Sequence, residues 1–439
     1  MKAVIIAGGK GTRLKSITGA DIPKPMVKIN SKTILERQIE SLKESNVVDI
    51  IILLGYLSEY IMSYFGDGSK FGVKIQYVVE NEPLGSAGAL FFLKDIIDDD
   101  FFFIYGDLLL DIDWIKFLKF HRENKKTITI FAHPNSHPYD SDILLVDANN
   151  SLLGINKKNS ERNKLWLRNL TNAGVYVVSP SIFSLFSMCR KMAFEDDVIY
   201  PFIETQQVVT YISSEYVKDI GTPERYNQAI SDLEKGIIRN KRLSNKQKAI
   251  FLDRDGTINK YMGFLNNIDD FFLEENAARA IKIINNSGYL AIVVTNQPSV
   301  ARGEISLIEL DKVHSKMDTL LGAKGAFLDA TYFCPHHPDK GFFGERPELK
   351  FDCDCRKPKP GLIHKAKEKF NIDLSKSYMI GDTYRDVKTA ENAGVIGILL
   401  DSGSEEKMKN KFNCEAVAHC ANILDAVTFI MNKEGVDYD

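Results

Sequence analysis

Short apolar runs alternate with amphipathic stretches along the chain. The run Lys2–Ala7 predicts a buried strand that leads into a glycine-rich turn, and Thr33–Ser45 carries apolar residues at the spacing of one helix face. Val47–Leu54 and Phe101–Tyr105 predict two further strands. This alternation of strands and helices is typical of an α/β fold with a mostly parallel sheet.

The pattern is interrupted at the basic and polar stretch Glu234–Lys248. Its weak periodicity and its lack of aromatic residues indicate the end of a helix and a solvated linker, in preference to a nucleic-acid patch. The alternation then resumes, so we expect two α/β domains, at 1–235 and 248–439, joined by a linker at 236–247. The strands expected in the second domain are Ala249–Leu252, Tyr289–Thr295, Tyr378–Ile380 and, as the last of the chain, Val395–Leu400.

Composition narrows the class of protein. The 439 residues include 56 Lys and Arg against 59 Asp and Glu, a net charge of −3 that disfavours a nucleic-acid partner. No apolar run approaches the ~20 residues of a membrane span, and the first run is too short for a signal sequence. We therefore expect a cytoplasmic protein without membrane contact, whose six cysteines are free thiols or metal ligands. An oligomer is compatible with the sequence.

The glycine-rich turn after the first strand is a candidate phosphate-binding loop. Gly8, Gly9 and Gly11 let backbone N–H groups approach a triphosphate, and Arg13 adds positive charge beside Thr12. The turn does not end as a Walker loop does, and as a bare pattern it is more often a tight turn. Further segments strengthen the phosphate-binding interpretation: Lys24 in Pro-Lys-Pro-Met, Gly85 in a small-residue loop, Asp107 at a strand end and Asp219 in Asp-Ile-Gly-Thr-Pro-Glu.

Together these segments resemble the sugar-1-phosphate nucleotidyltransferases over residues 1–235. The resemblance implies a Rossmann-like, GT-A-like domain in which the glycine-rich turn and Arg13 bind a nucleoside triphosphate. It also implies that Lys24 contacts phosphate and that Gly85 lines the pocket for the base and sugar. Asp107 and Asp219 would hold Mg²⁺, which neutralises charge while the sugar phosphate attacks the α-phosphorus.

The sugar side of this candidate site departs from the family. Asn172 matches the family position that touches the sugar. Where the family often carries Phe-x-Glu-Lys, this chain has Ile155–Lys158, so Lys158 can fill the lysine role but the glutamate is missing. A sugar other than a hexose therefore becomes plausible. We expect the nearby Asp111 to be a surface carboxylate and His121 to be solvated or capping.

Two carboxylates at a strand end mark a second candidate site. Asp253 and Asp255, in Asp-Arg-Asp-Gly-Thr, can serve one phosphoryl group, one as nucleophile and one on the leaving-group proton. Two aspartates at this spacing often occur by chance. The same half also carries Thr295 at the end of a later strand, Lys357 in Arg-Lys-Pro-Lys-Pro-Gly, and Asp382 in Ile-Gly-Asp.

These four segments, in this order, resemble the haloacid dehalogenase (HAD) superfamily of phosphatases over residues 248–400. The resemblance implies a HAD-like Rossmannoid fold in which Asp253 forms an aspartyl-phosphate and Asp255 is the general acid and base. It implies that Thr295 and Lys357 bind the transferring phosphoryl group. Mg²⁺ would be held by Asp253, Asp382 and the backbone carbonyl of Asp255.

Three cysteines and a histidine in this half form a candidate metal site. Cys334 and His336 are followed by Cys353 and Cys355, which supplies three thiolates and an imidazole. Such a set suits a closed, tetrahedral Zn²⁺ site of the structural kind. We expect it to hold the loop that carries Arg356.

A zinc loop of this kind is shared by histidinol-phosphate phosphatases and D-glycero-D-manno-heptose 1,7-bisphosphate phosphatases, and Ala-Arg-Gly at 301–303 resembles the heptose branch. Asn296, Arg302 and Arg356 are candidates for substrate binding. The N-terminal half resembles in particular the heptose 1-phosphate guanylyltransferases. The fusion then implies that heptose 1,7-bisphosphate loses its 7-phosphate and that heptose 1-phosphate reacts with GTP to give GDP-D-glycero-α-D-manno-heptose.

Other interpretations stay open at this point. The transferase could act on another sugar phosphate, such as mannose 1-phosphate, or use UTP, CTP or dTTP, because base contacts in the family are largely to backbone. The phosphatase could be of the histidinol-phosphate type. A regulatory sensor of nucleotide sugars without turnover is disfavoured because the acidic residues of both candidate sites are retained.

Overall fold

The computed structural model describes residues 1–9, 22–158, 165–401 and 412–437. The chain divides into two compact units, and short segments from the N-terminal half belong to the second one. The first unit comprises Met1–His133, Leu144–Asn156 and Asn172–Arg242, and the second Pro134–Ile143, Lys157–Thr171 and Leu243–Asp439.

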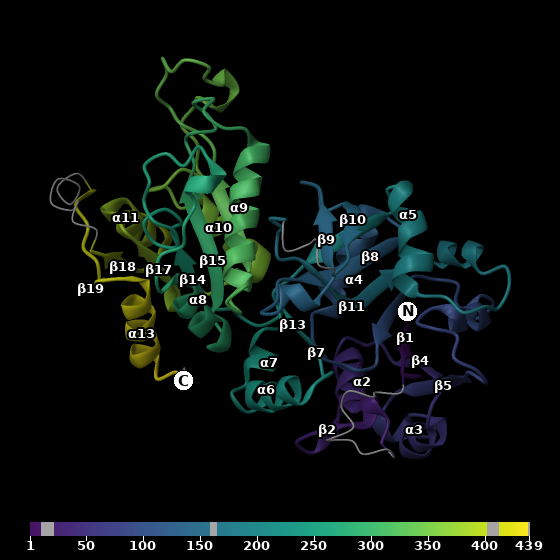
Figure 1. Cartoon of the computed structure of the whole chain (residues 1–439). Helices are drawn as coiled ribbons and strands as arrows, with labels where there is room; N and C mark the ends of the chain where they lie inside the picture. Colours follow the sequence, from purple (N-terminus) through teal and green to yellow (C-terminus); the bar gives the residue numbers. More distant parts are fainter. Residues whose placement is uncertain (10–21, 159–164, 402–411, 438–439) are drawn as a thin grey trace. The chain divides into compact units, whose positions relative to one another are not determined.

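The first unit is built on a mixed sheet in the order β10-β9-β11-β6-β1-β4-β5, from which β8 and β12 continue beside β11 (Figure 1). β1 lies between β4 and β6 and runs parallel to both, whereas β11 is antiparallel to β6. A small separate pair joins β7 to β13. The strands are β1 (Lys2–Ile6), β2 (Lys28–Ile29), β3 (Lys32–Thr33), β4 (Asp49–Leu54), β5 (Lys74–Val79), β6 (Phe101–Tyr105), β7 (Leu108–Asp111), β8 (Ile128–His133), β9 (Ile143–Val146), β10 (Leu152–Asn156), β11 (Thr171–Val178), β12 (Val208–Ile212) and β13 (Tyr216–Asp219).

The helix expected at Thr33–Ser45 is confirmed as α2. α2 begins after Thr33, whose side chain accepts from the Glu36 N–H in a capping box, and it buries the apolar face expected from its spacing. The expected strands before and after it are confirmed as β1, β4 and β6. The helices are α2 (Ile34–Glu44), α3 (Ser58–Phe65), α4 (Trp114–Asn124), a π-helix (Phe194–Ile199), α5 (Tyr200–Glu204), α6 (Pro223–Glu234) and α7 (Ile237–Asn240).

The stretch expected as a linker begins as ordered structure. α7 lies within it and buries Ile237 in a core cluster with residues of α6 and β13. Arg242, just beyond α7, donates from Nη1 to Asp111 Oδ1 at 3.4 Å, and both side chains are buried. The expectation of a surface position for Asp111 is therefore wrong. His121 is also buried, with Nδ1 2.7 Å from Thr129 Oγ1, contrary to the solvated or capping position expected for it.

The second unit is a three-layer α/β/α structure around a parallel sheet in the order β16-β15-β14-β17-β18-β19. Side chains alternate along β14, so Ile250 and Leu252 pack with α8 and α13, while Ala249 and Phe251 pack with α10 and α11. The elements are β14 (Ala249–Leu252), α8 (Ala277–Asn286), β15 (Leu290–Asn296), α9 (Leu307–Gly322), β16 (Ala330–Cys334), α10 (Gly361–Phe370), β17 (Tyr378–Gly381), α11 (Tyr384–Ala393), β18 (Ile396–Leu400), β19 (Ala418–Cys420) and α13 (Ile423–Glu434).

The end of the chain completes this second core. β19 pairs in parallel with β18, so the expectation that the strand ending at Leu400 would be the last one is wrong. α13 buries Val427 and Ile430 in the same core cluster as β14 and α8. Among the helices of the described residues, none has the length and apolar character needed to cross a membrane.

Candidate active sites

The first candidate site lies where parallel strands of the first unit end. Ile6 of β1 is in register with Tyr105 of β6, so the backbone after each strand reaches the same edge of the sheet. A cavity of about 810 Å³ opens there. Its lining includes Gly8, Gly9, Lys24, Gly85, Ser86, Tyr105, Asp107 and Gly221.

Two carboxylates stand at this edge, each beside a cation. Lys24 is buried in the short helix Lys24–Met26, and its Nζ donates to Asp107 Oδ2. Asp219 is in register with Leu108 across the β7–β13 pair, and Arg225 Nη1 donates to its Oδ2. The structure therefore brings the two predicted Mg²⁺ ligands, Asp107 and Asp219, to neighbouring strand ends.

The predicted loop at Gly85 needs glycine at that position. Gly85 has a φ of +80°, and a Cβ there would lie 2.3 Å from the Met192 carbonyl oxygen. Lys158 belongs to the second compact unit, where its backbone N–H donates to Asp142 Oδ1 at 3.0 Å. The predicted binding residues Gly11, Thr12 and Arg13 lie outside the described residues.

A hydrogen-bonded chain that begins at the cavity wall was not predicted from the sequence. Tyr105, which lines the cavity, donates from its hydroxyl to Glu195 Oε1 at 2.7 Å, and Tyr176 donates to the same oxygen at 3.0 Å. The predicted sugar-contacting Asn172 donates from Nδ2 to the Tyr176 hydroxyl at 2.7 Å. Glu195 lies in the π-helix, a rare conformation that occurs often at functional sites. That local conformation is not visible in the sequence pattern.

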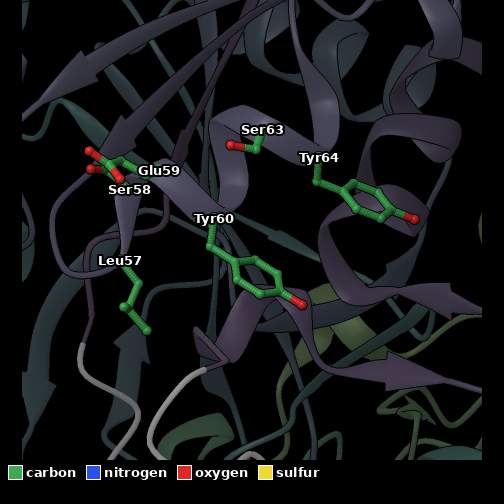
Figure 2. Close-up of a pocket in the computed structure, with 6 residues that line it drawn as sticks. All are labelled: Leu57, Ser58, Glu59, Tyr60, Ser63 and Tyr64. Carbon is green, nitrogen blue, oxygen red and sulfur yellow. The ribbon is translucent and has the colours of Figure 1, made fainter.

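A second hollow, of about 740 Å³, lies along α3. Figure 2 shows Tyr60 and Tyr64 projecting from this helix, one turn apart, with Glu59 as the charged residue of the lining. The Tyr64 hydroxyl donates to Glu36 Oε2 at 3.2 Å. The lining contains none of the predicted site residues, so we assign it no chemistry.

The second candidate site lies at the ends of β14, β15 and β17. Asp253 follows β14, and Lys357 Nζ reaches both Asp253 Oδ2, at 2.9 Å, and Asp386 Oδ1, at 2.6 Å. The lysine side chain is 2% exposed and that of Asp386 is 1% exposed. Burial lowers the pKa of Lys357, but the two carboxylates outweigh it and raise the pKa, so the lysine is a buried cation.

Three carboxylates crowd together in this site. Oxygens of Asp253, Asp382 and Asp386 lie within 4.8 Å of one another. Burial raises the pKa of Asp253 to about 6 against the pull of Lys357, and burial with the charges of Asp253 and Asp386 raises that of Asp382 to about 8. A hard divalent cation would relieve this repulsion, and carboxylate oxygens are the ligands that Mg²⁺ prefers. The backbone at Gly256, with a φ of +79°, comes so close to Asp382 that a Cβ would lie 2.2 Å from its Oδ2.

The carboxylate of Asp255 points into a different set of partners. Arg254 and Asn259 donate to its Oδ1, and Gln297 Nε2 donates to its Oδ2 at 2.8 Å. Burial would raise the pKa of Asp255, but these donors lower it. The geometry thus separates the predicted nucleophile, Asp253 beside Lys357, from the predicted acid and base, Asp255, which has its own set of partners.

The remaining predicted residues surround these carboxylates. Thr295 is buried at the end of β15. The side chain of Asn296 accepts from the Lys357 N–H at 3.0 Å and donates to its carbonyl at 3.1 Å, so it fixes the backbone of the lysine. The Arg302 guanidinium lies 4.2 and 4.3 Å from the ring centres of Phe264 and Phe342.

The cysteine and histidine cluster forms a compact donor set. Sγ of Cys334 lies 3.5 Å from that of Cys353, Cys355 Sγ lies 3.3 Å from Cys353 Sγ, and His336 Nδ1 lies 3.2 Å from Cys355 Sγ. Ligands at 2.3 Å from a tetrahedral Zn²⁺ would be separated by about 3.7 Å, so this set fits a metal after a small expansion. Arg356 Nη1 donates to the His336 carbonyl at 3.2 Å, which ties the predicted substrate-binding arginine to the cluster.

Comparisons with known proteins match the two halves of the chain to different families. The family described as nucleotidyl transferase matches residues 2–236, and the HAD-hydrolase-like family matches residues 354–426. The D-glycero-β-D-manno-heptose-1,7-bisphosphate 7-phosphatase of Haemophilus ducreyi is 37% identical over 186 residues, which is 42% of this chain and 98% of that protein. The chain belongs to both the nucleotidyl transferase family and the heptose bisphosphate phosphatase family.

Two further comparisons match one half of the chain each. The heptose bisphosphate phosphatase of Escherichia coli K12 is 40% identical over 147 residues, covering 34% of this chain and 75% of that protein. The crystal structure of HddC from Yersinia pseudotuberculosis is 30% identical and covers 53% of this chain and 99% of that one, with a TM-score of 0.46. The family match and the phosphatase relatives show that the chain combines a nucleotidyltransferase with a heptose bisphosphate phosphatase, as the sequence motifs predicted.

Proposed function

We propose that the chain performs two consecutive steps in the synthesis of a nucleotide-activated heptose. The phosphatase half removes the 7-phosphate of D-glycero-D-manno-heptose 1,7-bisphosphate. The transferase half then joins heptose 1-phosphate to GMP from GTP, giving GDP-D-glycero-α-D-manno-heptose and pyrophosphate. The observation that carries the proposal is the fusion itself: removing a 7-phosphate leaves a sugar 1-phosphate, which is the nucleophile of a sugar nucleotidyltransferase.

In the phosphatase half, each protein group has a defined task. An Asp253 oxygen attacks the phosphorus, and the bond to the sugar oxygen breaks as that oxygen takes a proton from Asp255. Water then cleaves the aspartyl-phosphate, with Asp255 taking up the proton. Lys357 offsets negative charge beside the nucleophile, and Asp386 holds the lysine in place. Mg²⁺ bound by Asp253, Asp382 and the Asp255 carbonyl would supply charge neutralisation.

In the transferase half, the phosphate of the sugar is already ionised and needs no general base. The problem is to bring two anions together, which the cation at Lys24 and the N–H groups of Gly8 and Gly9 address. Lys24 now pairs with Asp107. Asp107 and Asp219 would hold Mg²⁺, which would offset phosphate charge, and Lys24 is the cation beside Asp107 that contacts phosphate.

The cysteine cluster is proposed to hold Zn²⁺ in a structural role. Three thiolates and the imidazole of His336 would occupy all four coordination positions of a tetrahedral Zn²⁺, which leaves no position for substrate. The bound ion would fix the segment that carries Arg356, next to Lys357 in sequence. Arg302 and Arg356 are then the cations available for the second phosphate or the sugar.

The test is a one-pot assay of the full chain with Mg²⁺, either anomer of heptose 1,7-bisphosphate and each nucleoside triphosphate in turn, read by mass spectrometry. We expect GDP-heptose with GTP and not with UTP, CTP or ATP. Asp253→Asn should stop product formation until heptose 1-phosphate is added. Asp107→Asn should still release phosphate but form no nucleotide sugar.

A matched control is Asp352→Asn, which changes an exposed aspartate paired with Lys359 and should leave both steps intact. Phosphate release without any nucleotide sugar from any triphosphate would refute the transferase assignment. A nucleotide sugar formed only from mannose 1-phosphate or another hexose phosphate would refute the heptose assignment.

A further inference from the structure

Arg254 occupies an unusual position between the two catalytic aspartates of the phosphatase half. Its side chain is 1% exposed, yet it carries a charge and follows the nucleophile directly in sequence. The guanidinium turns toward Asp255, with Nη2 2.9 Å from both carboxylate oxygens and Nε 3.2 Å from Oδ1. A planar guanidinium that meets both oxygens fixes the plane of a carboxylate as well as its position.

Gln297 closes a ring with this pair. Its Oε1 accepts from Arg254 Nη2 at 2.9 Å while its Nε2 donates to Asp255 Oδ2 at 2.8 Å. The same Nε2 lies 3.0 Å from the hydroxyl oxygen of Thr295, the residue predicted to bind the phosphoryl group. Asn259 adds a donor to Asp255 Oδ1. The carboxylate is therefore held from both of its oxygens.

The far side of the guanidinium is held by His314 of α9. Arg254 Nη1 lies 3.3 Å from His314 Nε2, and the histidine is buried. Because a guanidinium has only donors, Nε2 must be the acceptor, and the imidazole is neutral with its proton on Nδ1. Among the described residues, no hydrogen bond joins His314 to Asp255. Any influence of His314 on that carboxylate therefore passes through Arg254.

We propose that Arg254, supported by His314, is a positioning residue that aims the Asp255 carboxyl group at the leaving oxygen of the substrate. The proposal rests on the phosphatase function described above. In the step concerned, the bond between phosphorus and Asp253 forms, the bond between phosphorus and the sugar oxygen breaks, and the proton of Asp255 moves to that oxygen. A misdirected carboxyl group would leave attack by Asp253 possible, but it would impair proton transfer and, with it, the departure of an alkyl oxygen.

Because Asp253 and Asp255 have different roles, the proposal predicts a measurable difference between alkyl and aryl phosphate substrates. An alkyl oxygen is a poor leaving group and needs the proton, whereas p-nitrophenolate leaves without one. Loss of general acid catalysis typically costs 10²- to 10⁴-fold. Arg254→Lys keeps the charge but cannot meet both carboxylate oxygens. We therefore expect first-turnover release of the sugar from the sugar phosphate to fall by about 10²-fold, with the first-turnover burst of p-nitrophenolate from p-nitrophenyl phosphate nearly retained. Later turnovers slow for both substrates, because Asp255 is also the base that hydrolyses the shared aspartyl-phosphate.

Two variants extend the test beyond the arginine. Asp255→Asn should show the same selective loss and serves as the reference for a missing acid. His314→Leu should show a smaller loss with the same selectivity, and His314→Gln, which restores an acceptor for Nη1, should recover most of it. Arg346→Lys, which changes an arginine bound to the Ile305 carbonyl, is the matched control and should spare both substrates.

The possible results distinguish a failure of this proposal from a failure of the heptose assignment. Equal losses in the first-turnover rates for alkyl and aryl phosphates, in either the Arg254 or the His314 variants, would mean that the buried cation is only structural and would overturn the proposal. Retention of full sugar-phosphate turnover in Arg254→Lys and His314→Leu would overturn it as well. An error in the heptose assignment would appear in the wild-type protein, and the best alkyl phosphate of a panel would then replace heptose bisphosphate in the same comparison.

Discussion

The phosphatase half contains two lysine–aspartate pairs with the same N···O distance, and their lysines are two residues apart in sequence. Comparing the two pairs tests how burial determines what an ion pair contributes to stability. Lys357 lies 2.6 Å from Asp386 and Lys359 lies 2.6 Å from Asp352. The first pair is 2% and 1% exposed, whereas the second is 41% and 70% exposed. Asp386→Ala and Asp352→Ala therefore remove the same kind of contact from opposite environments.

The expected costs differ several-fold. Removing one partner of a buried pair typically costs about 3–5 kcal/mol, against about 0.2–1 kcal/mol for an exposed pair. Two features of Asp386 modify the expected cost of removing it. Its removal also takes an acceptor from the Thr383 N–H and hydroxyl, but it relieves repulsion with Asp253, which keeps Lys357 paired at 2.9 Å. We expect roughly 3 kcal/mol, the lower end of the range for buried pairs.

Calorimetry of the full chain in Mg²⁺-free buffer measures the difference. For a unit of this size, 3 kcal/mol corresponds to a fall in melting temperature of roughly 6–12 °C in the transition of the phosphatase half. Asp352→Ala should shift it by less than about 4 °C. Phosphatase activity should fall in Asp386→Ala alone, and transferase activity should be unchanged in both variants.

Equal shifts in the two variants would refute the reasoning, since burial would then have no part in the strength of the pair. Raising the salt concentration gives an independent check. Screening should shrink the small effect of Asp352→Ala and leave that of Asp386→Ala nearly unchanged, because the buried pair is shielded from mobile ions.

Further outcomes are expected elsewhere in the chain. Gly256→Ala should abolish phosphatase activity in a folded protein, because a Cβ would meet the Asp382 carboxylate and φ is +79°; an active variant would contradict this. Glu195→Ala should raise KM for the sugar phosphate more than KM for GTP, as steady-state kinetics can show, because it releases Tyr105, which lines the cavity, and Tyr176, which holds Asn172. Cys353→Ser should lower the zinc content measured by mass spectrometry and the phosphatase activity, while sparing the transferase. The melting-temperature gain from Mg²⁺ should grow as pH rises from 6 to 8.5, because the raised pKa values of Asp253 and Asp382 leave them protonated at low pH, where protons compete with the ion.

The sequence alone predicted much of the fold and the placement of many site residues. Lys2–Ala7, Phe101–Tyr105 and Ala249–Leu252 all became strands, at or within one residue of their expected bounds. Asp107 and Asp253 were placed at strand ends for the same reason. In a parallel sheet the carboxyl ends of neighbouring strands meet at one edge, so motifs that follow strands converge there whatever the loops between them do.

The tertiary structure decided the partners of buried polar groups. Asp111 was expected at the surface, but Arg242, far along the chain, pairs with it and both side chains are buried. Arg254 meets His314, and Tyr105 meets Glu195, through contacts that no local pattern encodes. A charged side chain can be buried only where donors or acceptors from other elements surround it. Short-range spacing therefore determined which residues carry the chemistry, and packing over long sequence distances determined which residues hold them in place.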